Sequence, residues 1–227
     1  MTRTIILATP HQRNDELEAR LRAVGGLQIE RICERDALTA GALAKIAPRY
    51  VFFPHWSWKI SDEVFENFEC VIFHMTDVPF GRGGSPLQNL ISRGIYQTQL
   101  TALRCVAEMD AGPVYLKRPL DLSGTAEEIY RRASALMAGM IEEITAREIV
   151  PQPQIGEVVT FKRRTPDESD ISGLGDLTRV FDFIRMLDAE GYPHAFIETE
   201  TLRLEFTGAQ QEAGAVLAKV KIEMRRP

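Results

Sequence analysis

The chain of 227 residues has little that would tie it to a membrane, to an oxidising compartment or to a metal. No apolar run approaches the roughly 18 residues of a membrane-spanning helix, and the first apolar stretch is too short for a signal peptide. Three widely separated cysteines exclude a disulfide framework, and their strand-like surroundings predict core thiols at Cys33, Cys70 and Cys105. His and Cys never recur at zinc-ligand spacing, and no GxxxxGK[ST], GxGxxG or GxSxG motif is present. We therefore expect a cytoplasmic protein with no metal site and no serine nucleophile elbow.

An excess of basic residues is also missing. The 27 Lys and Arg are outnumbered by 32 Asp and Glu, which gives a formal net charge of −5. A mildly acidic chain is a poor general binder of nucleic-acid phosphates or anionic lipids, since both require a basic face. The charge therefore argues against a nucleic acid or a membrane as partner.

Short apolar runs alternate with amphipathic stretches through the first third of the chain. Runs typical of buried strands lie at Thr4–Ala8, Leu27–Cys33, Tyr50–Phe53 and Cys70–His74. Between them the spacing predicts three helices, namely one capped by Asn14, one over Asp36–Ile46 and a short one capped by Ser61. Strands separated by such helices are typical of βαβ units, so we expect an α/β fold with a parallel sheet covered on both faces.

The pattern changes after residue 74. Further strands are predicted at Thr98–Val106 and Pro113–Lys117, followed by a long helix from Thr125 to about Glu148. The PQPQ stretch at residues 151–154 is the best linker, because its two prolines forbid a continued helix. We predict two domains, one over residues 1–150 and a small α+β domain over residues 151–227. This second domain carries ten Lys and Arg against thirteen Asp and Glu.

Three segments could carry chemistry, because ligands of open α/β sheets bind outside the carboxyl ends of the strands. His74 closes a predicted strand and leads into the loop HMTDVPFGRGGSP, whose glycines could admit a ligand or simply form a tight turn. Asp110, in EMDAGPVY, is either an Asx cap or a carboxylate that orients an imidazole. The HWSW run over residues 55–58 either stacks on a planar ring or anchors its loop on the sheet.

Together, HMTDVPFGRGGSP and EMDAGPVY resemble the formyltransferases that use N10-formyltetrahydrofolate, a family with methionyl-tRNA, glycinamide-ribonucleotide and nucleotide-sugar members. The family signature is Asn-x-His-x-Ser-Leu-Leu-Pro, then a glycine-rich stretch ending in proline, and later Leu-Asp-x-Gly. Its conserved positions correspond here to His74, Pro79, Gly83, Gly84, Pro86, Asp110 and Gly112. The resemblance implies a Rossmann-like parallel-sheet domain with a small C-terminal extension, and N10-formyltetrahydrofolate as co-substrate.

The resemblance also implies roles for individual residues. His74 would accept a proton from the attacking amine or stabilise the tetrahedral oxyanion, and Asp110 would hold His74 in its working tautomer. The pterin ring of the folate would lie against one loop and one turn, which comprise His55, Trp56, Ser57, Trp58, Asp110, Ala111 and Gly112. The acceptor substrate would contact a further set of residues: Thr76, Arg82, Gly83, Gly84, Lys162 and Arg163.

One position departs from the family signature. Ile72 stands where the family has its asparagine, and an apolar side chain cannot donate a hydrogen bond to the formyl oxygen. Either another group takes this role, with a backbone amide, His55, Thr76 and Gln97 as candidates, or the enzyme is slow or inactive. We expect a substitute donor, because the rest of the loop keeps the family pattern.

The short acidic tail favours a small substrate over tRNA, which implies a longer chain with a basic C-terminal domain. Glycinamide ribonucleotide implies a first loop with Gly and Ser or Asn, whereas residues 9–15 read TPHQRND. The variant pattern is similar to divergent sugar N-formyltransferases of pseudaminic-acid-type pathways. We therefore expect formyl transfer to a nucleotide-linked 4-amino-dideoxy sugar, with UDP as the expected nucleotide and the oligomeric state, including a homodimer, left open. The alternatives are a non-catalytic folate- or nucleotide-binding relative and a formyltransferase for another small amine.

Overall fold

The computed structural model describes residues 3–225, which form two compact units. The first unit contains the described residues up to Gly83, together with Thr98–Leu120 and Arg131–Thr160. The second contains Gly84–Gln97, Asp121–Tyr130 and the described residues from Phe161 onward. Each unit is therefore assembled from several stretches of the chain, and the domain boundary after residue 150 stays a prediction. Within residues 3–225, none of the helices combines the length and apolar character needed to cross a bilayer.

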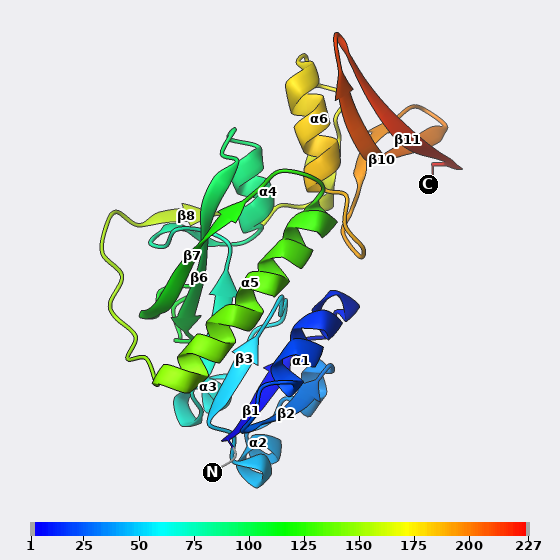
Figure 1. The fold of residues 1–227 in the computed structure, drawn as a ribbon. Coiled ribbons are helices and arrows are strands. Elements are labelled where there is room, and N and C mark those ends of the chain that lie inside the picture. Colours follow the sequence, from blue (N-terminus) through cyan, green and yellow to red (C-terminus); the bar gives the residue numbers. More distant parts are fainter. Residues whose placement is uncertain (1–2, 226–227) are drawn as a thin grey trace. The chain divides into compact units, whose positions relative to one another are not determined.

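The first unit is built on a six-stranded sheet with the order β2-β1-β3-β4-β6-β7 (Figure 1). The strands are β1 (Arg3–Ala8), β2 (Leu27–Ile32), β3 (Tyr50–Phe53), β4 (Cys70–His74), β6 (Gln97–Arg104) and β7 (Val114–Asp121). Strands β2, β1, β3 and β4 are parallel, which confirms the predicted α/β fold. Strand β6 pairs antiparallel with β4, so the sheet is mixed rather than wholly parallel. Parallel pairing would require the chain to cross back to the end of the sheet where β4 begins. The segment between β4 and β6 contains no such crossover helix, so β6 runs antiparallel to β4.

Helices cover both faces of this sheet (Figure 1). Helix α1 (Asp15–Arg22) lies beside the part of α5 (Ala126–Arg147) that belongs to the first unit, and Arg20 Nε donates to Glu142 Oε1 at 2.7 Å. The other face packs on α2 (Ala40–Ile46) and α3 (Asp62–Asn67). Because successive strand residues point to opposite faces, alternate residues of β1 and β3 enter each core. The α2/α3 core includes Ile6, Ala8, Leu43, Val51, Phe53, Val64 and Phe65.

Three local predictions about helix starts are wrong. Asn14 and Ser61 precede α1 and α3, but neither side chain makes a capping hydrogen bond. The side chain of Asn14 is instead fully buried and bonded within the first unit. The segment predicted as one helix over Asp36–Ile46 is a 3-10 turn over Arg35–Ala37 followed by α2, because Thr39 accepts from Ala42 N and begins a new helix.

The predicted loop after β4 contains a short strand, β5 (Phe80–Gly83), which pairs with β8 (Val159–Phe161). Val159 N donates to Pro79 O at 3.2 Å. The glycine-rich loop is therefore ordered by backbone pairing with a segment far along the chain, which local sequence patterns do not report.

The second unit contains α4 (Pro86–Ile91), α6 (Leu177–Met186) and an antiparallel sheet in the order β11-β10-β9. Its strands are β9 (Ala195–Glu198), β10 (Leu202–Glu212) and β11 (Ala215–Met224). Arg185 of α6 is buried, pairs with Asp182 at 2.8 Å and donates to Leu122 O and Gly124 O. This C-terminal antiparallel sheet confirms the predicted α+β extension.

Candidate active site

Two elements of the first unit bring His74 and Asp110 together. His74 ends β4, and Asp110 lies in the turn between β6 and β7. His74 Nδ1 is 3.5 Å from Asp110 Oδ2, and both side chains are only about a tenth exposed. The same carboxylate oxygen accepts a 2.9 Å hydrogen bond from Gly83 N, so the glycine-rich loop also converges on Asp110.

The other ring nitrogen of His74 faces a carbonyl group. His74 Nε2 lies 2.7 Å from Gly81 O, and Thr76 Oγ1 donates to the same oxygen at 3.2 Å. A carbonyl oxygen only accepts, so Nε2 carries a hydrogen in this arrangement. The ring can then donate to Asp110 as well only when it is doubly protonated. Nδ1 is therefore the ring nitrogen that faces the Asp110 carboxylate.

The turn that carries Asp110 is tightly constrained. Asp110 has φ = 53°, in the left-handed region that non-glycine residues rarely adopt. Ala111 N donates to Glu108 O at 3.3 Å within this turn. A Cβ atom at Gly112 would lie 1.8 Å from Arg104 O, so only glycine fits there. Gly112 thus has a packing role in addition to the predicted contact with the folate.

Arg82 is held within the protein by two partners. Its Nε and NH2 atoms donate to Gln154 Oε1 at 3.1 and 2.9 Å, and its NH1 donates to Glu108 Oε1 at 3.1 Å. The amide nitrogen of Gln154 donates to Asp110 O and Gly112 O at 2.7 and 2.8 Å. Gln154 was missed by the sequence reasoning, which assigned residues 151–154 to a linker. The only local signal for it is a polar amide directly after a proline.

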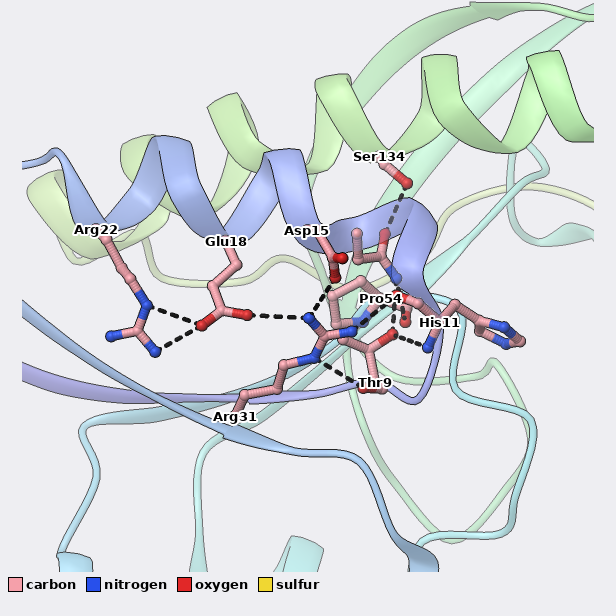
Figure 2. A network of polar contacts seen from close by, with 9 residues as sticks. Thr9, His11, Asp15, Glu18, Arg22, Arg31, Pro54 and Ser134 are labelled. Carbon is pink, nitrogen blue, oxygen red and sulfur yellow. Dashed lines mark hydrogen bonds and ion pairs between the residues drawn. The ribbon is translucent and has the colours of Figure 1, made fainter.

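A second polar network lies where β1 and β3 end (Figure 2). Asn14 Nδ2 donates to Thr9 Oγ1 at 2.7 Å and to Pro54 O at 3.3 Å, and Ser134 Oγ donates to Asn14 Oδ1 at 2.7 Å. His55, which has φ = 53°, places Nε2 3.1 Å from Ser134 Oγ. Because the hydroxyl hydrogen of Ser134 is used on Asn14, this oxygen accepts from His55. The network therefore places the proton of His55 on Nε2.

Arg31 holds the loop after β1 against the same network (Figure 2). Its guanidinium donates to Thr9 O and His11 O at 3.2 and 2.8 Å and pairs with Asp15 and Glu18. The strand order reverses between β1 and β3, a position where open α/β sheets bind ligands. The loops at this end of the sheet are thus held by side chains rather than by strand pairing.

The tryptophans after β3 differ in burial. Trp56 packs on the α2/α3 core, with its ring centroid 5.9 Å from that of Phe53 and 4.7 Å from that of Trp58. Its indole Nε1 is buried and has no hydrogen-bond partner within residues 3–225. Ser57 and Trp58 are exposed. Trp56 therefore anchors the loop, while its buried donor is suited to a ligand acceptor.

The remaining candidates lie in the second unit. A Cβ atom at Gly84 would lie 2.4 Å from Arg163 Cβ, so this glycine permits a close approach of two segments. Asn89 Nδ2 donates to Gly84 O and Lys162 O at 3.0 and 2.9 Å, which ties the same segments together. The side chains of Lys162 and Arg163 are exposed. Their contact with a substrate stays a prediction, as does the proposed donor role of Gln97.

Two of the three cysteines are core thiols, as predicted, but Cys33 is exposed. Burial raises the pKa of Cys105 to about 11 and raises the pKa of Cys70 still further. Neither buried thiol is thus suited to act as a thiolate nucleophile near neutral pH. The prediction for Cys33 is wrong because it follows the end of β2, the edge strand of the sheet.

Comparisons with known proteins extend this picture. A family model described as methionyl-tRNA formyltransferase, C-terminal domain, matches residues 166–223. A solved structure of methionyl-tRNA formyltransferase from Clostridium thermocellum is 46% identical, with a TM-score of 0.96, and the match covers 98% of this chain and 100% of that one. The methionyl-tRNA formyltransferase of Wolinella succinogenes is 25% identical over 183 residues, which is 78% of this chain and 54% of that protein. The chain spans about half the length of the curated relatives it matches.

These findings overturn the prediction of a nucleotide-sugar substrate and of a pseudaminic-acid pathway. The 4-N formyltransferase from Francisella tularensis is only 12% identical, with a TM-score of 0.67 over 87% of this chain, which is a likeness of fold alone. The expectation of no nucleic-acid partner is contradicted as well, because the relative matched over its whole chain is a methionyl-tRNA formyltransferase. The substrate prediction relied on the variant loop pattern and on the short acidic tail, and the partner prediction relied on the net charge of the chain. A net charge is an average over the whole surface, whereas recognition depends on a few local contacts.

Proposed function

Since the chain belongs to the formyltransferase family that includes methionyl-tRNA formyltransferase, we propose that it transfers the formyl group of N10-formyltetrahydrofolate to the amino group of methionyl-tRNA. The observation that carries this proposal is the 46% identity to a methionyl-tRNA formyltransferase along essentially the full length of both chains. The match of residues 166–223 to the C-terminal domain of the same enzyme supports it independently.

His74 and Asp110 are the proposed catalytic residues. The amine attacks the formyl carbon, the carbon–N10 bond breaks, and the proton lost by the amine is delivered to N10 of the departing tetrahydrofolate. His74 carries that proton between the two nitrogens, and Asp110, 3.5 Å from its Nδ1, stabilises the protonated ring. A group that holds the proton during both the formation and the breakdown of the tetrahedral intermediate lowers the barriers of both steps.

The oxyanion must be stabilised without the family's asparagine. Ile72 packs against the α2/α3 core and offers no donor. The hydroxyl of Thr76 already donates to Gly81 O. Both ring nitrogens of His74 also face other acceptors, Gly81 O and Asp110 Oδ2. Backbone amides of the glycine-rich loop are therefore the proposed donors to the formyl oxygen.

One observation supports the proposal that a pterin ring binds against the loop after β3. The buried indole N–H of Trp56 has no protein partner among the described residues, and a buried donor without an acceptor costs about 1–3 kcal/mol. A pterin carbonyl or ring nitrogen is an acceptor of the required kind. Trp56, His55 and the Asp110–Gly112 turn are the residues proposed to hold the folate.

A direct assay tests this function. The full chain is incubated with N10-formyltetrahydrofolate and methionyl-tRNA, and formylmethionine is measured after the ester bond is hydrolysed. We expect transfer to methionyl-tRNA but none to free methionine, whose amine lacks the contacts that the tRNA provides. His74→Ala is the control for enzyme-dependent transfer. Retained binding of the folate with no transfer to methionyl-tRNA would contradict the proposal.

A further inference from the structure

Residues 151–155 are anchored to the sheet of the first unit. Val114 N donates to Gln152 O at 2.7 Å, and Gln152 N donates to Val114 O at 2.8 Å, so the segment continues the sheet beyond β7 by one isolated bridge. Pro151 and Pro153 fix φ near −65°, and a residue that precedes proline prefers an extended backbone. The prolines therefore hold an extended segment that presents Gln154 at a set position.

Both the oxygen and the nitrogen of the Gln154 side-chain amide form hydrogen bonds. Its oxygen accepts two hydrogen bonds from Arg82, and its nitrogen donates to Asp110 O and Gly112 O. A guanidinium only donates and a carbonyl only accepts, so the orientation of the amide is unambiguous. Gln154 thus ties the loop after β4 to the turn between β6 and β7.

Both tied segments converge on the Asp110 carboxylate. Gly83, which follows Arg82, donates to Asp110 Oδ2, and the same oxygen faces His74. The left-handed backbone of Asp110 is a sparsely populated conformation, and it persists where the surrounding structure holds it. Gln154 donates to the carbonyl of Asp110 itself and to the carbonyl two residues later in the same turn.

We propose that Gln154 is a positioning residue that holds the Asp110 turn in its left-handed conformation and thereby keeps the carboxylate on Gly83 and His74. The catalytic consequence rests on the proposed formyl transfer, whereas the structural consequence does not. Glutamate cannot replace this glutamine, because its carboxylate has no hydrogen for the two carbonyls and would face them with a negative charge.

The test compares Gln154→Glu and Gln154→Ala with Gln152→Glu in the full chain. Gln152 lies in the same segment, but among residues 3–225 its side chain donates only to Val150 O, so it is a matched control for the change of charge. The amide resonance of Gly83, followed by NMR without substrate, reports its hydrogen bond to Asp110. Its proton signal should move upfield in both Gln154 variants and stay in place in Gln152→Glu.

Steady-state kinetics provide the second readout. Small displacements of catalytic groups cost up to about 100-fold in rate, so we expect kcat to fall by about 10- to 100-fold in both Gln154 variants with KM changed less than threefold. An unchanged Gly83 resonance, or a loss confined to Gln154→Glu, would overturn the proposal, since the effect would then come from the added charge. If the wild-type chain transfers no formyl group, the proposed function fails while the NMR comparison still decides the role of Gln154.

Discussion

At the scale of the residue, Asp110 contributes both a backbone conformation and a charge. Its φ of 53° aims the carboxylate at Gly83 N and His74 Nδ1. Asp and Asn are the side chains that tolerate the left-handed region best. The backbone and the charge can therefore be separated by a single substitution.

We expect Asp110→Asn to abolish most of the activity without disturbing the fold. Asparagine keeps the left-handed turn and can still accept from Gly83 N, but it does not stabilise a protonated His74. Loss of general acid–base catalysis costs about 10²- to 10⁴-fold, and kcat should fall within that range while the midpoint of thermal unfolding stays close to that of the wild type. Asp36→Asn, on an exposed turn, is the control. Turnover of Asp110→Asn within threefold of this control would show that the carboxylate does not act on His74.

At the scale of the element, the loops after β1 and β3 and the helix α5 are joined by the side chain of Asn14. Its amide connects Thr9, Pro54 and Ser134, and Ser134 in turn accepts from His55. All four contacts lie within the first unit, and Asn14 is fully buried. This network orders the end of the sheet at which the folate is proposed to bind.

Asn14→Ala should destabilise the first unit because it leaves the Ser134 hydroxyl and the Pro54 carbonyl without their partner. Buried polar groups left unsatisfied cost about 1–3 kcal/mol. Both tryptophans of the chain lie in the first unit, so urea unfolding followed by their fluorescence reports on this unit. Asn67→Ala is the matched control, since Asn67 lies at an exposed helix end and, within the described part of the chain, its side chain donates only to Glu63 O. Equal shifts of the urea midpoint in the two variants would contradict a supporting role for the network.

At the scale of the whole molecule, an acidic chain is proposed to bind an acidic nucleic acid. With a formal net charge of −5, phosphate contacts must come from a few placed cations rather than from a broad basic face. Lys162 and Arg163 are exposed and adjacent, and they are the cations that the sequence assigns to the substrate. Such binding should depend on salt only moderately.

We expect KM for methionyl-tRNA to rise about 20- to 40-fold between 50 and 200 mM KCl, which corresponds to about three phosphate contacts. The double variant Lys162→Gln, Arg163→Gln should lower the slope of log KM against log salt by about 2 and leave kcat unchanged. Lys45→Gln, on α2 of the first unit, should leave both parameters unchanged. A slope unchanged in the double variant would remove Lys162 and Arg163 from the tRNA interface.

The positions of most elements follow from local patterns in the sequence. The strands β1, β3 and β4 are apolar runs, and α5 has helical spacing, so each is predicted within a few residues of its observed bounds. His74 and Asp110 were singled out by a loop motif and a turn motif in the same way. Hydrophobic periodicity and turn chemistry act over a few residues, and this is why a sequence reports them.

Contacts between distant segments were decided only by the tertiary structure. Asn14 precedes a helix and has the residue type of a cap, yet its side chain bonds Ser134, 120 residues later. Gln154 lies in a proline-rich stretch typical of a linker, yet it holds the Asp110 turn. The sequence by itself singled out His74 and Asp110, the residues proposed to perform formyl transfer, and the tertiary structure decided which groups hold them in place. The free energy of a buried hydrogen bond depends on a partner brought near by folding, and no local pattern encodes that partner.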